Sequence, residues 1–248
     1  MFTIALTRAR ATALVAAVLA AAALSAGLAQ PVPYRGVPGG PEWLVGDFAA
    51  AYQAAAQVDS VAAQLLASRA ASDQAVYHET EADAASAWLT RAEAAALRSL
   101  ELEPGGPLAA SANMALARAK GEAGLHRGGL ANARLPGELR ALFERTLELE
   151  PDNADALVAY AAWHFALTEI GVGWLYGADR AKVLPLMERG VAAAPRQLNL
   201  RVEYARVLLS LGLEDVAREQ VETALGLPAL TAADAFEQTR ARALLAAP

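Results

Sequence analysis

From Glu42 onward, apolar side chains recur at spacings of three and four residues, and polar and apolar residues do not alternate with a period of two over any useful length. This spacing predicts α-helices, because half-buried strands require strict alternation. One apolar stripe runs from Leu44 to Leu65. A second runs from Val76 to Leu100, with Asp73 as a candidate N-cap. The pattern therefore predicts an all-α fold.

Four expected helices finish in similar sequences, SLELEP, TLELEP, GVAAAP and TALGLP, which close on Pro104, Pro151, Pro195 and Pro228. Proline lacks a backbone donor and disfavours helical backbone in the residue before it, so each proline predicts a helix end. After Pro151, Asp152 or Asn153 can cap the next helix. Repeated helix–turn–helix sequences predict a solenoid, in which each repeat buries its apolar face against its neighbours.

These repeats resemble the tetratricopeptide repeat (TPR) family, best between Leu198 and Leu227. There Tyr204 and Ala205 stand where the family has its Leu-Gly pair, and Gly212 stands at the turn. In the second helix, residues at the family spacing follow at Ala217, Val221, Ala224 and Leu225. The preceding repeat matches in its first helix, through Leu157, Tyr160, Ala161 and His164. The resemblance covers roughly residues 80 to 230, and it implies a helical-hairpin solenoid.

Two consecutive repeats are longer than the family period of about 34 residues. The surplus lies between the two helices of each repeat, in Gly121–Gly137 and Gly171–Asp179. Because both insertions occupy the same turn of stacked repeats, we expect them side by side on one edge. They would offer four side chains to a partner, namely Arg127, Arg134, Trp174 and Tyr176. Alternatively, the two aromatic residues fold back and seal the edge of the solenoid.

The last repeats contain two further signals. Pro185 either kinks a helix that begins near Asp179 or belongs to a helix that begins later. Thr231 can cap a final helix from Ala232 to Leu245. The polar face that a capping helix needs would then consist of Glu237, Gln238, Arg240 and Arg242.

By the resemblance, first helices form a concave binding face. In this chain that face would carry Asp155, Val158, Ala162 and Phe165 in one repeat and Asn199, Val202, Arg206 and Leu209 in the next. This implies a non-catalytic scaffold that binds a peptide or an envelope protein. The alternative is a soluble accessory subunit of a TRAP-type solute transporter, whose solenoid lines a small-molecule passage and oligomerises. A homo-oligomer is left open.

The N-terminal sequence indicates export. Residues 1–29 begin with arginines, continue in an apolar run from Ala11 to Leu24 and end in small residues, with cleavage expected after Ala29. This pattern is typical of a secretory signal peptide and predicts a periplasmic or secreted protein. An organellar transit peptide and a retained membrane anchor are the alternatives. A Pro- and Gly-rich leader would follow at residues 30–41, and the repeat domain at residues 42–248.

Composition and motifs argue against several classes of function. The chain has no cysteine, which excludes disulfides and thiolate ligands, and its net charge of −6 without a basic block argues against nucleic-acid binding. Among the three histidines, His164 has no second metal ligand one helical turn away, so it is expected in the core. Neither a nucleophile elbow nor a phosphate-binding loop is present in the sequence. We therefore expect no enzyme, no cofactor and no metal site.

Overall fold

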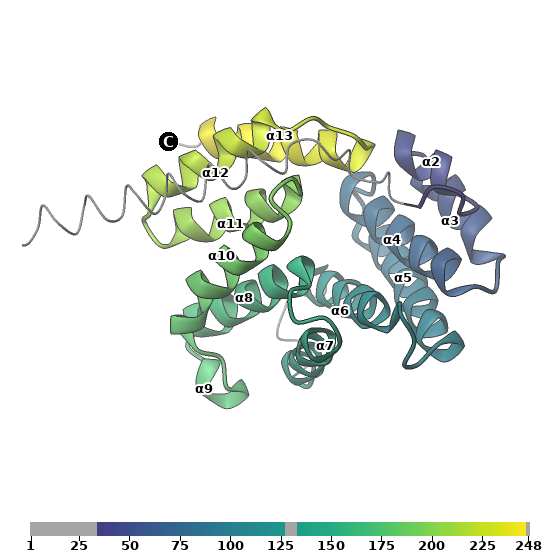
Figure 1. Cartoon of the computed structure of the whole chain (residues 1–248), viewed down its shortest axis with the longest axis horizontal. Helices are drawn as coiled ribbons and strands as arrows, with labels where there is room; N and C mark the ends of the chain where they lie inside the picture. The colour runs from purple at the N-terminus through teal and green to yellow at the C-terminus, as the bar shows by residue number, and fades with distance from the viewer. Residues whose placement is uncertain (1–33, 127–132, 247–248) are drawn as a thin grey trace, which may run out of the picture. The chain divides into compact units, whose positions relative to one another are not determined.

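The computed structural model describes residues 34–126 and 133–246. In these ranges the chain forms α-helices, one short 3-10 helix and no strand (Figure 1), which confirms the all-α prediction. The expected signal peptide, the start of the leader and Arg127 lie outside the described residues. Of the rest of the leader, Tyr34 is half-buried and packs edge-on against Trp43, with ring centroids 5.3 Å apart.

Successive helices pack as neighbouring pairs: α4 with α5, α6 with α7, α8 with α10, and α11 with α12. The helices are α2 (Gly40–Val45), α3 (Phe48–Ala56), α4 (Val61–Tyr77), α5 (Ala82–Leu102), α6 (Ala109–His126), α7 (Leu135–Leu149), α8 (Ala154–Glu169), α9 (Gly173–Tyr176), the 3-10 helix η1 (Arg180–Lys182), α10 (Val183–Ala193), α11 (Leu198–Ser210), α12 (Glu214–Gly226) and α13 (Ala232–Ala246).

The four proline-terminated sequences end helices as predicted. Helices α5, α7, α10 and α12 each stop two residues before their proline. The residue in between leaves the helical conformation in every case, with ψ of 78°, 88°, 70° and 143° at Glu103, Glu150, Ala194 and Leu227. The proline ring clashes with helical backbone in the preceding residue, so the same local constraint produces all four ends.

Two of the predicted caps, at Asn153 and Thr231, are also present. The Asn153 side chain accepts a hydrogen bond from the Ala156 N–H at 2.9 Å and starts α8. Thr231 and Asp234 form a reciprocal capping box, because each backbone N–H donates to the other's side chain at 3.1 and 2.9 Å. Pro185 lies in the first turn of α10, which begins at Val183, so the later helix start is the correct alternative.

The N-terminal helices differ from the prediction. The stripe from Leu44 to Leu65 is divided among three helices, because Gly46 has φ 92° and the Ser60 side chain caps a new helix at Val61. Asp73 is not an N-cap but lies buried inside α4. A buried carboxylate needs partners, and Asp73 accepts hydrogen bonds from Trp43 Nε1 at 2.8 Å and from Arg69, one turn earlier, also at 2.8 Å.

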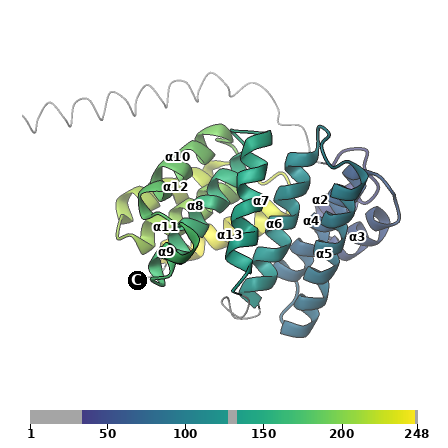
Figure 2. The same ribbon diagram turned by 90° about the horizontal axis from the view of Figure 1, so that it is seen from below.

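The end of the described unit contacts its beginning. Helix α13 contacts α2, and the Phe236 ring stacks on Tyr77 of α4 with ring centroids 4.9 Å apart and planes 8° apart. The Tyr77 hydroxyl donates a hydrogen bond to Glu237 Oε1 at 2.7 Å. Within residues 34–246 the helices therefore form a closed circuit of contacts, seen from two directions in Figures 1 and 2. We call this circuit the helix ring.

Because α13 closes the helix ring, one residue that was expected on its outer face is buried instead. Glu237 was expected on the polar outer face of the last helix, yet only 6% of it is exposed. It faces Tyr77 and accepts a further hydrogen bond from Arg240 at 2.8 Å. A final helix that packs against both its predecessor and α4 has less surface to present to solvent than a simple cap.

Small residues allow neighbouring helices to pack closely against each other. Ala205 is wholly buried in the core cluster that also contains Ala217 and Val221. Gly190 of α10 lies directly against α8, where an added β-carbon would be 2.5 Å from Val158 Cγ2 and 3.2 Å from the Ala154 carbonyl oxygen. The contact between these two helices therefore depends on the missing side chain.

Gly190→Ala should destabilise the protein by about 1–3 kcal/mol, because the new methyl group overlaps Val158. Gly226→Ala is the matched control: nothing lies within 4 Å of its added β-carbon, and higher helix propensity should stabilise by up to about 1 kcal/mol. Urea unfolding followed by circular dichroism measures both. Equal stabilisation by the two substitutions would contradict the observed contact between α8 and α10.

Candidate functional site

The helix ring surrounds a cavity of about 890 Å³. Residues of α4, α6, α7, α8, α11 and α13 line it, whereas α5, α10 and α12 pack behind those helices and supply none of the described lining residues. A volume of this size lies within the range of pockets for small organic ligands. The cavity is therefore the candidate functional site.

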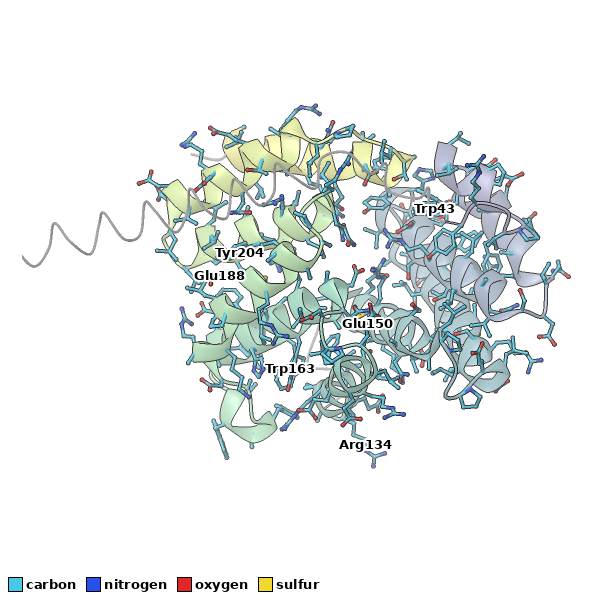
Figure 3. All side chains as sticks on the ribbon, in the orientation of Figure 1. Trp43, Arg134, Glu150, Trp163, Glu188 and Tyr204 are labelled. Carbon is cyan, nitrogen blue, oxygen red and sulfur yellow. The ribbon has the colours of Figure 1, made fainter. Side chains whose placement is uncertain are left out.

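One wall of the cavity is apolar and comes from α6, α7 and α8. Its largest members are Met114, Leu135, Leu139, Phe143, Trp163 and Leu167. The indole of Trp163 is 7% exposed and donates a hydrogen bond to the Pro136 carbonyl at 3.1 Å. This bond fixes the ring between α8 and the start of α7 (Figure 3). Trp163 therefore presents an apolar surface while its single polar group is satisfied.

The charged residues of the lining, here called the charged wall, come mainly from α4, α6, α11 and α13. Four ion pairs occupy it: Arg69–Asp73 at 2.8 Å, Arg118–Asp155 at 3.3 Å, Arg206–Glu203 at 2.6 Å and Arg240–Glu237 at 2.8 Å. The cavity lining is thus amphipathic, because it contains both large apolar side chains and paired charges.

Burial changes the acid–base behaviour of this wall. Burial opposes the charged form of Arg69, but the Asp73 carboxylate together with Tyr34 and Tyr77 outweighs this and raises the pKa of Arg69. Burial, together with the Glu237 carboxylate, raises the pKa of the Tyr77 hydroxyl. Burial also raises the pKa of Glu122, against the attraction of Arg118 and the Ser72 hydroxyl. Tyr77 and Arg69 therefore keep their protons, so that Tyr77 can donate to Glu237.

The structure places most of the predicted concave-face residues on the cavity. Asp155, Val158, Ala162, Asn199, Val202 and Arg206 all line it. Phe165 does not: it is 8% exposed and packs in the core cluster with Val183 and Met187. Leu209 is half-buried against the same cluster. Whether the lining residues contact a partner stays a prediction.

The lining residues from α4, α6 and α13 are not among those predicted for the concave face. A signal was nevertheless present in the two alanine-rich helices α4 and α6. Each contains an arginine followed by an acidic residue four positions later, Arg69 with Asp73 and Arg118 with Glu122. Charges one turn apart on a helix share a face, so each pair marks the polar side of an otherwise apolar helix.

The two insertions meet, as predicted. Tyr176, from the second insertion, donates a hydrogen bond from its hydroxyl to the Ala133 carbonyl of the first at 2.9 Å. Its own carbonyl accepts a bond from Arg140 of α7 at 3.1 Å. Tyr176 also packs on the cluster around Phe143. The two aromatic residues therefore differ: Tyr176 is half-buried, whereas 79% of Trp174 is exposed. Arg134 is exposed at the outer edge of α7 (Figure 3).

His164 is buried, as predicted. It is 0% exposed and packs against the rings of Tyr160 and Trp163. Its Nδ1 accepts a hydrogen bond from the Asp179 N–H at 2.9 Å, while Nε2 has no hydrogen-bond partner among the described residues. Burial, reinforced by the charge of Lys182, lowers the pKa of His164 to about 4. A neutral histidine thus holds the end of the second insertion against α8.

Within residues 34–126 and 133–246, no group of three or more histidine or acidic side chains is arranged to hold a metal ion. None of the helices in this part of the chain is both long and apolar enough to cross a bilayer. No protein-family model matches the chain, and a search of curated proteins returns no significant match.

His164 should make stability depend on pH. Its pKa in the folded state, about 4, lies below the ordinary value near 6.5. The unfolded state therefore binds more protons between these values, and the protein loses stability as the pH falls through this window. A shift of this size corresponds to a loss of about 3 kcal/mol.

His164→Gln should remove this loss. In urea unfolding at pH 7 and pH 4.5, the variant should lose less stability between the two pH values than the wild type does. An identical pH dependence in wild type and His164→Gln would show that His164 is not held neutral.

Substitution of Trp174 and of Tyr176 should change the free energy of unfolding by different amounts. Trp174→Ser should leave the free energy of unfolding within about 0.5 kcal/mol of wild type, because the side chain is exposed. Tyr176→Ser should cost about 1–2 kcal/mol, because it removes the hydrogen bond to Ala133 and packing on the Phe143 cluster. Thermal unfolding of both variants is the measurement. A larger loss for Trp174→Ser would contradict this assignment.

Proposed function

We propose that this protein is a non-catalytic binding protein that takes one small amphipathic organic molecule inside the helix ring. The observation that carries the proposal is the amphipathic cavity of about 890 Å³. Drug-sized ligands bury most of their surface in mainly apolar pockets in which a few polar groups fix their orientation. Here the wall around Phe143 and Trp163 would hold the apolar body, and the charged wall would orient the polar end.

We further propose that the ring is a TPR-like solenoid closed by its last helix. Paired helices, four proline-terminated helix ends and a turn at Gly212 with φ 73° support this architecture. Most of the described lining residues also come from the first helix of each pair, that is, from α4, α6, α8 and α11. Such a solenoid would stack its second helices on the outside.

Between the two functions implied by the resemblance, the cavity favours the small-molecule role over the peptide scaffold. An extended peptide needs a groove with free ends, whereas the contacts of α13 with α2 and Tyr77 close the circuit. An accessory subunit of a TRAP-type solute transporter would use such a cavity to hold its solute. Export by the N-terminal signal sequence would place the protein in the compartment where such solutes are captured.

Ala162 of α8 lines the cavity, so Ala162→Phe should fill space that a ligand needs. We expect N-phenyl-1-naphthylamine, a neutral fluorescent amphiphile, to bind the wild type saturably at 1:1 stoichiometry. Ala162→Phe should weaken this binding at least about tenfold, a loss of about 1.4 kcal/mol. Fluorescence titration and isothermal calorimetry measure affinity and stoichiometry.

Ala141→Phe provides the matched control, because Ala141 is exposed on α7 and outside the cavity lining. It should bind the probe as the wild type does. Absence of saturable binding to the wild type, or equal affinity of wild type and Ala162→Phe, would refute the cavity as a ligand site.

A further inference from the structure

The charged wall of the cavity contains one more carboxylate than its arginines neutralise. Arg69, Arg118, Arg206 and Arg240 are each paired with an acidic residue of the same wall. The Arg118 partner, Asp155, also accepts hydrogen bonds from Gln197 at 3.1 and 3.2 Å. The remaining carboxylate is Glu122 of α6. Among the described members of the wall, every arginine therefore has an ion-pair partner, whereas the Glu122 carboxyl group has none.

Glu122 is poorly satisfied by the protein itself. Among the described residues it forms no ion pair, and its Oε2 is buried without a hydrogen-bond partner. The Ser72 hydroxyl on the facing side of α4 is likewise buried without a partner of normal geometry. Burial of a carboxyl group is costly, and Glu122 is compensated only by the attraction of Arg118 and by the nearby Ser72 hydroxyl. Such a group is most stable when a ligand supplies the missing donor.

We infer that the ligand of this cavity is an amphipathic amine, whose ammonium group binds Glu122 and whose apolar part lies against Phe143 and Trp163. This inference rests on the proposed ligand-binding function and adds the chemical class of the ligand. An ammonium group offers several N–H donors and the opposite charge to the carboxylate. It therefore supplies a hydrogen-bond donor and an ion-pair partner to the carboxyl group that forms no ion pair with the described residues.

The alternative polar ends fit the wall less well. A carboxylate ligand would need an arginine, and each lining arginine would have to abandon its present partner and leave that carboxylate uncompensated. It would also approach Glu122, a like charge. A neutral alcohol can donate one hydrogen bond to Glu122 but brings no charge. The expected order of affinity at equal tail length is therefore amine, then alcohol, then carboxylate.

Three probes with the same eight-carbon tail test this order: octylamine, 1-octanol and octanoate, titrated calorimetrically into the wild-type protein at pH 7.5. We expect octylamine to bind at least about tenfold more tightly than 1-octanol, and octanoate to bind most weakly. Glu122→Gln should weaken octylamine binding about tenfold or more while leaving 1-octanol within about twofold. Circular dichroism confirms that the variant is folded.

Glu148→Gln is the matched control, since it removes the same charge from a residue outside the cavity lining whose side chain is 65% exposed. It should bind all three probes as the wild type does. Ala162→Phe should weaken both octylamine and octanol, which separates cavity binding from attraction to the acidic surface.

Tightest binding of octanoate by the wild type would overturn the inference even if Glu122→Gln failed to fold. So would equal loss of octylamine and octanol in Glu122→Gln, or octylamine affinity that is unaffected by the substitution. In these cases N-phenyl-1-naphthylamine would still bind the wild type, and only the ligand class would be wrong. If none of the probes bound, the proposed function itself would fail.

Discussion

The contact between Tyr77 of α4 and the last helix closes the helix ring. Phe236 stacks on the Tyr77 ring, and the Tyr77 hydroxyl donates to Glu237, so apolar and polar contacts coincide at one position. Glu237 in turn accepts from Arg240, whose guanidinium lies 5.1 Å from the centre of the Tyr77 ring. Because the two helices are distant in sequence, this cluster converts an open row of helices into a circuit around a cavity.

The charges that line the cavity also hold the helices together, which links stability to the candidate site. Asp73 joins Trp43 of α2 to Arg69 of α4, and Asp155 of α8 joins Arg118 of α6 to Gln197. A buried ion pair contributes little net stability, but removal of one partner leaves an uncompensated charge and costs several kcal/mol. The Arg118–Asp155 pair joins α6 to α8, whereas the other three pairs each lie within one helix. Among the described lining carboxylates, Glu122 has no ion-pair partner.

Closure also explains which sequence expectations for the site held. The inner faces of α8 and α11 could be predicted from the repeat register, and six of the eight expected residues line the cavity. Phe165 and Leu209 point into the helix pair instead, because α10 and α12 cover that side. The walls from α4, α6 and α13 required the tertiary structure, since no local pattern states which faces of distant helices meet.

The sequence by itself determined the helical class, the helix ends at four prolines, the caps at Asn153 and Thr231, and the burial of His164. These features depend on residues within one or two turns of each other, so local sterics and hydrogen bonding suffice. Only the tertiary structure decided that Asp73 is a buried partner of Trp43, that Glu237 faces inward and that Tyr176 joins two insertions. In each of these cases the partner lies 30 or more residues away, and an alanine-rich helix gives no local indication of which neighbour it will meet.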